Sequence, residues 1–489
     1  MLKPGLPRWL SSVLLILVVG VNSALAADLP ALHKLEKSGA RVSALVVNLP
    51  AGKVLAQMTP DTRLSPASLT KLYTAAASLM AWGPYQTFST RILARLPPRQ
   101  GRIQGDLVLL GGGDPTLTYS GLWQLAAQLS EAGVKQVNGD LVIDQSLFGN
   151  VACVSDDRCE AKSGSRFAYD APLSSAGMNF GTWCVAVAPS EPGRNAHVRQ
   201  CQLSVPDLSL AGHVKTVAAH LPTAIRVSRT RIGERDRLIL AGSIAADSPV
   251  QHIYRSVSDA PLQTGQIFQE VLLRSGIRIK GKIRVASTPA SDGMVTLAKV
   301  DSIPLAEQLQ RMMTYSNNYM ADTLALDLLA QQPDMKKPLT LDAAGAQLQA
   351  LAQSFEPESK QQGPVIRSGS GLTPENALSA TDLVALLKTM YMRTDLFPAF
   401  VGSLTVPEFS PLTIFKGKEQ GWRTRIAAKT GSLQDPVTVL GVAGYFRTRS
   451  GDWGAFALLI NGSAKWPHIP FAEGVQALRQ DLEKILIQH

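Results

Sequence analysis

Three apolar segments follow one another near the end of the chain, at residues 425–433, 437–446 and 453–460. A Ser-Gly-Asp turn at 450–452 separates the last two. Apolar segments of this length, joined by short turns, are typical of antiparallel strands. The pattern therefore predicts a three-stranded meander, and the apolar stripe along residues 471–487 predicts a final helix.

The first part of the chain predicts a hairpin and then a helix. Residues 42–49 and 53–57 are apolar segments that flank a Pro-Ala-Gly turn. Residues 67–82 are rich in Ala, Leu and Met and stop before a Gly-Pro pair, which is a typical helix end. We expect Ser65 to cap this helix and Pro66 to be its first residue.

The middle of the chain has a different pattern. From residue 88 to 260, short β-segments are separated by Gly, Pro and Ser, and helical patterns return only afterwards. We therefore expect an α+β fold in which residues 27–87 and 261–489 form one domain, an antiparallel sheet flanked by helices. Residues 88–260 are expected to form a β-rich insertion of one or two nested domains.

The N-terminal residues 1–26 read as a signal peptide. Lys3 and Arg8 precede an apolar stretch at 13–21, and Ala24-Leu25-Ala26 is a small-x-small cleavage site. The stretch is short for a stable membrane span, although an uncleaved anchor is the alternative. We expect an exported, periplasmic protein with no transmembrane segment after cleavage.

The charge of the chain is basic but dispersed. The sequence has 48 Lys and Arg against 38 Asp and Glu residues, with no dense basic block and no nucleic-acid motif. We therefore exclude nucleic acid as a partner. A basic exported protein suits an anionic cell-wall surface.

Four cysteines lie close together, at positions 153, 159, 184 and 201. An even, clustered set in an exported chain favours disulfides. Of the three possible pairings we favour Cys153–Cys159 and Cys184–Cys201, which close short local loops. The alternative is a zinc site, but the spacing lacks paired C-x-x-C motifs, so no metal is expected. These cysteines lie far in sequence from any reactive motif, and we interpret the bridges as structural cross-links.

Three short motifs carry the candidate chemistry: Ser68-Leu69-Thr70-Lys71, Ser316-Asn317-Asn318 and Lys429-Thr430-Gly431-Ser432. Each is weak alone, but the three in this order are the set found in penicillin-binding proteins and class A β-lactamases. The first would lie at a helix start, where the N–H of Ser68 is unpaired and can stabilise an oxyanion. Lys71 follows at i+3, within reach of Ser68 as its base. A capped helix with a solvated lysine is the alternative interpretation.

The other two motifs would bind the substrate. On a strand, Gly431 would let a substrate backbone approach closely, and the N–H of Ser432 could be a second oxyanion donor. The side chains of Lys429, Thr430 and Ser432 suit a carboxylate. Ser316 would relay a proton between the base and a leaving amine, although an ordinary helix-capping serine is the alternative. Asn318 could hydrogen-bond a substrate amide as both donor and acceptor.

With these motifs, and with further blocks such as Gly113-Asp114-Pro115-Thr116-Leu117 and Gly369-Ser370-Gly371-Leu372, the chain resembles the penicillin-binding protein 4 type of D-alanyl-D-alanine carboxypeptidase/endopeptidase. The resemblance implies a penicillin-recognising serine-enzyme fold. It implies that Ser68 is the acylated nucleophile, Lys71 its base and Ser316 the proton relay. Substrate binding would fall to Asn318, Lys429, Thr430, Gly431, Ser432 and Gln434.

The activity implied is that of a serine-type DD-carboxypeptidase/endopeptidase without a cofactor. It would act on peptidoglycan stem peptides through an acyl-enzyme and be inhibited by β-lactams. One departure concerns the groove, since relatives often have an Asp and a peptide-recognising Arg where this chain has Ser368 and Pro374. The alternative is therefore a non-hydrolytic penicillin-binding sensor or cell-wall binding protein. A β-lactamase is disfavoured because no deacylating glutamate is evident.

Overall fold

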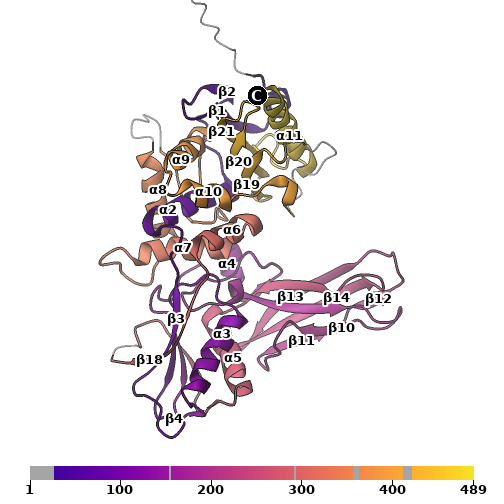
Figure 1. Ribbon diagram of the computed structural model, residues 1–489. Helices are drawn as coiled ribbons and strands as arrows, with labels where there is room; N and C mark the ends of the chain where they lie inside the picture. Colours follow the sequence, from indigo (N-terminus) through magenta and orange to yellow (C-terminus); the bar gives the residue numbers. More distant parts are fainter. Residues whose placement is uncertain (1–26, 154–155, 291–292, 356–362, 411–420) are drawn as a thin grey trace, which may run out of the picture.

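The computed structural model describes residues 27–153, 156–290, 293–355, 363–410 and 421–489. The expected signal peptide lies outside these ranges. One part of the molecule contains both ends of the described chain, and a second part, formed by its middle, extends away from it with a long β-arm (Figure 1). None of the helices in the described ranges combines the length and apolar character needed to cross a membrane.

A five-stranded antiparallel sheet forms the centre of the first part. The predicted meander is confirmed, and the predicted N-terminal hairpin adds to its far side, so that the first strand of the chain pairs with the last. In order across the sheet, the strands are β19 (Ile426–Leu433), β20 (Val439–Arg447), β21 (Trp453–Asn461), β1 (Arg41–Asn48) and β2 (Val54–Met58).

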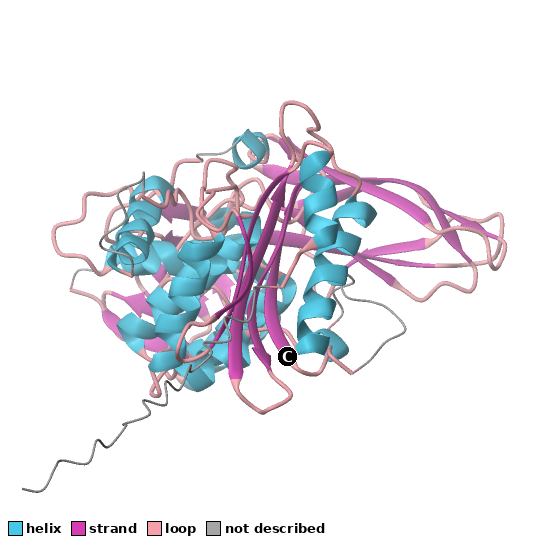
Figure 2. Cartoon of the chain, turned by 90° about the horizontal axis from the view of Figure 1, so that it is seen from above, coloured by secondary structure: helices cyan, strands magenta, loops and turns pink. Residues whose placement is uncertain are grey.

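Helices cover both faces of this sheet (Figure 2). Side chains alternate along each strand, so Val442 and Leu458 share one core with the terminal helices, whereas Ala443 and Leu459 share another with the remaining helices. The first face carries α1 (Pro30–Lys37) and α11 (Phe471–Gln488). The second core includes α2 (Lys71–Trp82), α6 (Leu305–Tyr315), α7 (Asn318–Ala330), α8 (Leu341–Ser354), α9 (Ala380–Met392) and α10 (Phe397–Ser403).

The inserted part is built on a second five-stranded sheet. In order, its strands are β17 (Ile283–Ala286), β7 (Leu141–Asp144), β5 (Leu107–Leu110), β3 (Ser89–Ala94) and β18 (Val295–Asp301), packed against α3 (Tyr119–Glu131) and α5 (Ala260–Arg274). The expected end of the insertion at residue 260 is therefore too early. β17 pairs with β7 and β18 with β3, so the insertion sheet is complete only at Asp301.

Within the described ranges, the rest of the insertion consists of three further sheets, two of which form the arm (Figure 1). One contains β10 (His197–Gln200), β9 (Thr182–Ala188) and β15 (Gln251–Ser256). A second contains β11 (Leu208–Gly212), β14 (Arg235–Ala245), β13 (Ala224–Ile232) and β8 (Gly164–Ser165), with β12 (Lys215–Val217) against β14. A third, away from the arm, contains β16 (Arg278–Ile279), β6 (Gln136–Val137) and β4 (Arg102–Ile103).

Both predicted disulfides are present, Cys153–Cys159 and Cys184–Cys201. The second joins β9 to the residue after β10, within the arm. The first encloses the short helix α4 (Asp156–Glu160). That helix lies against the first part of the molecule, because Arg158 forms an ion pair with Asp322 of α7. The first bridge therefore lies near the middle motif in space, although it is far from that motif in sequence.

Candidate active site

The turn before Ser68 differs from the predicted cap. Residues Ala67–Thr70 form a 3₁₀ helix, η1, which continues into α2 at Lys71. The Ser65 hydroxyl caps nothing and has no hydrogen-bond partner in the structure. Instead, Asn461 of β21 accepts from the Ser65 N–H at 2.8 Å and donates to its carbonyl at 3.0 Å. A distant side chain therefore sets this turn, in which Ala67 has a left-handed φ of 47°.

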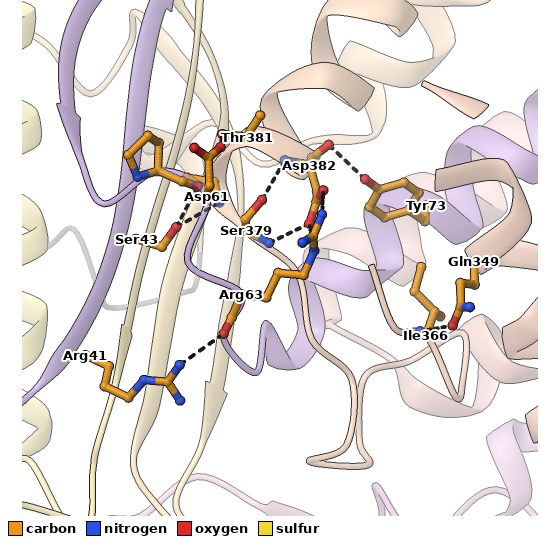
Figure 3. A network of polar contacts seen from close by, with 12 residues as sticks. Arg41, Ser43, Asp61, Arg63, Tyr73, Gln349, Ile366, Ser379, Thr381 and Asp382 are labelled. Carbon is orange, nitrogen blue, oxygen red and sulfur yellow. Dashed lines mark hydrogen bonds and ion pairs between the residues drawn. The ribbon is translucent and has the colours of Figure 1, made fainter. Parts of the chain in front are cut away.

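A buried polar network anchors the chain that leads to this turn (Figure 3). Arg63 donates two hydrogen bonds of 3.1 Å to the carboxylate of Asp382, which also accepts from the N–H of Ser379 in a capping box at the start of α9. The Tyr73 hydroxyl of α2 donates to the Asp382 carbonyl at 2.8 Å. α9 therefore fixes both the approach to η1 and the helix that follows it.

Lys71 occupies the centre of the site. Its Nζ lies 2.8 Å from each of three acceptors, the Ser68 Oγ, the Asn318 Oδ1 and the carbonyl of Ser370, and the side chain is fully buried. Burial lowers the pKa of Lys71 well below its ordinary value, and the positive charge of Lys429 lowers this pKa further. A neutral amine in this position can accept the proton of Ser68. Because Lys71 is buried, the alternative interpretation of a solvated lysine is wrong.

The middle motif lies between two helices. Ser316 ends α6 in a left-handed conformation with φ of 51°. Asn317, not Ser316, caps α7, because its side chain accepts from the N–H of Met320. The alternative that Ser316 is an ordinary cap is therefore wrong. Its Oγ instead accepts a hydrogen bond of 2.9 Å from Lys429 Nζ.

Asn318 is placed beside the base. Its Oδ1 accepts from Lys71, and its Nδ2 donates at 3.3 Å to the carbonyl of Tyr169 from the insertion. Both ends of the amide are therefore occupied within the protein. A substrate amide would have to replace one of these contacts, and the longer one to Tyr169 is the weaker.

The third motif lies on β19, as predicted, and Gly431 also has a packing role there. A Cβ on Gly431 would lie 2.5 Å from the Pro66 carbonyl oxygen and 3.1 Å from the Ser68 nitrogen. The missing side chain therefore lets the start of the catalytic helix approach the strand. Lys429 points to the same side and is buried, and burial lowers its pKa to about 7.

The outer edge of β19 offers free backbone groups. β19 is the edge strand of its sheet. Among the described residues, Ala428 forms a pair of hydrogen bonds with Thr405 across that edge, and the Thr430 carbonyl accepts from Lys429 Nζ at 2.7 Å. Backbone groups alternate along a strand, so the N–H groups of Thr430 and Ser432 point to the same edge as that of Ala428. The Ser432 N–H, which we expect to be a second oxyanion donor, therefore points away from β20 at the edge of the sheet.

A cavity of about 450 Å³ lies beyond the end of β19, and its lining includes Ser65 and Pro374 but none of the motif residues. Gln434 is exposed just after the strand. Ser368, by contrast, is buried, and its Oγ accepts from the Gly371 N–H at 3.2 Å within the loop beside Lys71. The cavity is lined by the segments 63–65, 374–377, 436–439 and 461–464 together with Arg41.

Sequence reasoning missed three residues that surround the motifs. Asp322 and Arg158 form a buried ion pair behind Lys71, and Tyr169 contacts Asn318. The only available signal was the position of Asp322 four residues after the end of the middle motif, since nothing in the sequence brings the insertion to this site. No group of three or more His, Cys, Asp or Glu side chains suited to a metal occurs in the described ranges.

The chain is similar to known proteins over most of its length. The model of the D-Ala-D-Ala carboxypeptidase 3 (S13) family matches residues 23–475. A D-alanyl-D-alanine carboxypeptidase from Actinomadura sp. (strain R39) is 30% identical over 362 residues, which are 71% of this chain and 64% of the relative. The chain thus covers just under two thirds of that relative's length. The D-alanyl-D-alanine carboxypeptidase DacB of Haemophilus influenzae is 24% identical, over 87% of this chain and 86% of the relative.

The fold has a solved counterpart. The crystal structure of penicillin binding protein 4 (dacB) from Haemophilus influenzae superimposes with a TM-score of 0.74 at 22% identity. The match covers 93% of this chain and 99% of the other. Both parts of the molecule therefore belong to one known architecture, and the expected fold class is confirmed.

Proposed function

Because the chain belongs to the D-Ala-D-Ala carboxypeptidase 3 (S13) family, we propose that it is a serine-type DD-carboxypeptidase/endopeptidase that cleaves peptidoglycan stem peptides and is acylated by β-lactams. The observation that carries this proposal is the contact of a fully buried Lys71 with Ser68 at 2.8 Å. We place the enzyme in the periplasm, which agrees with the expected signal peptide.

Acylation begins with proton transfer from Ser68 to the neutral amine of Lys71. The Ser68 Oγ then attacks the carbonyl carbon between the two D-alanine residues and forms a tetrahedral intermediate. The N–H groups of Ser68 and Ser432 stabilise its oxyanion. The terminal carboxylate is held by the charge of Lys429 and the hydroxyls of Thr430 and Ser432.

Departure of the amine needs a proton at its nitrogen. Lys429 Nζ donates to Ser316 Oγ, so the Ser316 hydroxyl keeps its own hydrogen for another acceptor. Ser316 gives this proton to the leaving nitrogen and is reprotonated from Lys71. The C–N bond breaks, D-alanine or a cross-linked peptide is released, and water then attacks the ester with Lys71 again as the base.

The assignment is tested with fluorescent penicillin, followed by proteolysis and mass spectrometry. We expect a single adduct on Ser68 and no adduct on Ser68→Ala. Release of D-alanine from a D-Ala-D-Ala tripeptide and from cross-linked muropeptides then separates an enzyme from a non-hydrolytic sensor. A label on another serine overturns the site, whereas labelling of Ser68 without peptide turnover favours the sensor.

A further inference from the structure

A continuous series of buried polar contacts runs from Lys71 into the insertion. Lys71 Nζ donates to the Ser370 carbonyl at 2.8 Å, and the Ser370 N–H donates to Asp322 Oδ1 at 2.8 Å. The other oxygen, Asp322 Oδ2, accepts from Arg158 Nη2 at 2.6 Å. Thus four residues on separate segments link the proposed base to helix α4 of the insertion.

The terminal ion pair of this series is poorly suited to a merely stabilising role. The side chains of Asp322 and Arg158 are 0% and 4% exposed. Burying two charges costs about as much free energy as their attraction returns. Arg158 Nη1 also has no hydrogen-bond partner among the residues that the structure describes, which adds a further cost. A pair that contributes little to stability and ends at the site suggests a function there.

Both members of the pair act on the charge state of Lys71. The charged groups that face this amine are Lys429 on β19, Asp322 on α7 and Arg158 on α4. The Asp322 carboxylate raises the pKa of Lys71, and the guanidinium of Arg158 lowers it. Within the pair the two effects oppose each other, so loss of either partner leaves the other charge uncompensated beside the base.

We propose that Arg158 and Asp322 are positioning residues for Lys71. Asp322 accepts from the N–H of Ser370 and so holds the backbone whose carbonyl accepts from Lys71. Arg158, which belongs to the insertion, compensates the negative charge of Asp322. Without Arg158, that negative charge would keep Lys71 protonated. This inference rests on the proposed function. It gives the insertion a direct part in assembling the site, in addition to any contact with substrate.

The test is the pH profile of acylation. The second-order rate constant with fluorescent penicillin is measured from pH 5 to 9 for the wild type, Arg158→Met and Asp322→Asn. Removing the cation should raise the pH at which the rate begins to rise, because the unpaired carboxylate then favours the ammonium. Removing the anion should lower it. We also expect Arg158→Met to reduce the rate at pH 7 by about ten- to a hundredfold.

The matched control is Arg229→Met. Arg229 is also a fully buried arginine of the insertion paired with an aspartate, Asp236 at 3.3 Å, but it lies in the arm. We expect this variant to lose thermal stability with an unchanged pH profile. Arg158→Lys, which keeps the charge, should recover most of the wild-type profile, and it allows the test even if Asp322→Asn does not fold.

The outcomes separate the two proposals. If the wild type is not labelled at Ser68, the proposed function fails. If the wild type is labelled, shifts in opposite directions for the two variants support the positioning roles. If the two variants have lower rates but keep the wild-type pH profile, as expected of Arg229→Met, the positioning roles are overturned. The ion pair is then a structural contact.

Discussion

At the scale of single residues, Gly431 makes the sharpest prediction. Its absent side chain lets β19 contact the backbone of Pro66 and Ser68, neither of which can move aside like a flexible side chain. Gly431→Ala should therefore displace Ser68 from Lys71 and lower the acylation rate by about a hundredfold. The measurement is stopped-flow labelling with fluorescent penicillin.

The control for this substitution is Gly402→Ala in α10. A Cβ on Gly402 meets no atom within 4 Å, so acylation should be unchanged. Equal acylation rates for Gly431→Ala and the wild type would contradict the prediction. They would show that β19 and the turn at Ser68 can move apart without loss of activity.

The lowered pKa of Lys429 predicts that acylation becomes slower at alkaline pH. Because its pKa is about 7, its ammonium group loses a proton above pH 7, and with it the attraction for a carboxylate. The second-order rate constant with benzylpenicillin should therefore fall above about pH 7, by roughly tenfold for a lost charge-assisted hydrogen bond. Benzylpenicillin methyl ester has no carboxylate, so its rate should not fall in this range. Parallel declines would assign the effect to another group.

Local chemistry at these residues was predictable, but distant partners were not. The i+3 spacing placed Lys71 beside Ser68, and short loops identified both disulfides. The Ser65 cap failed because Asn461, 396 positions away, supplies the hydrogen bonds of that turn. Sequence proximity alone gives no information about such a partner.

At the scale of elements, helix α4 connects a disulfide to the site. Cys153–Cys159 fastens the helix that carries Arg158, so replacing both cysteines with serine should loosen Arg158 and lower acylation by about tenfold. The loss of stability should be about 2–3 kcal/mol for so short a loop. Labelling rate and thermal unfolding, measured on the same sample, separate the two effects.

The second bridge provides the comparison. The variant with serine at positions 184 and 201 lacks a cross-link of the arm and should lose stability of similar size, yet keep its rate of labelling. If both double variants lose activity equally, α4 has no special connection with the site.

Elements were predicted well where their pattern is local. The meander and the final helix follow directly from apolar periodicity and turns. The end of the insertion was misplaced because α5 reads as an ordinary amphipathic helix. Only the pairings of β17 with β7 and of β18 with β3, between strands about 140 and 200 positions apart, assign that stretch to the insertion sheet.

At the scale of the whole molecule, a carboxyl pair lies between the insertion and α7. Gly113, next to Asp114, packs closely against Asp327, whose Oδ2 has no hydrogen-bond partner in the structure. Burial raises the pKa of Asp114 to about 6, and burial and the charge of Asp114 raise that of Asp327 well above its ordinary value. The folded protein therefore holds protons here that the unfolded chain releases above about pH 4.

The free energy of unfolding should consequently fall as the pH rises from about 4 through 6 and beyond, because the protonated carboxyl groups of Asp114 and Asp327 favour the folded state and are lost over this range. Asp327→Asn is neutral at every pH, so it should raise the free energy of unfolding at pH 8 by about 2 kcal/mol and change little at pH 5. Thermal unfolding at both pH values measures this. Glu234→Gln, in an exposed turn, is the control, and an equal gain at both pH values would contradict the prediction.

The pairing of β1 with β21 constrains the order in which the protein can fold. β1 cannot gain this neighbour until the strand at 453–461 has emerged from the ribosome or the translocation pore, about 400 residues later. The insertion can complete its own sheet far earlier, because its last strand ends at Asp301. Contacts this distant in sequence close slowly. Until then the N-terminal hairpin has an open strand edge, and a chaperone that shields residues 41–58 would protect this edge before its last neighbour is available.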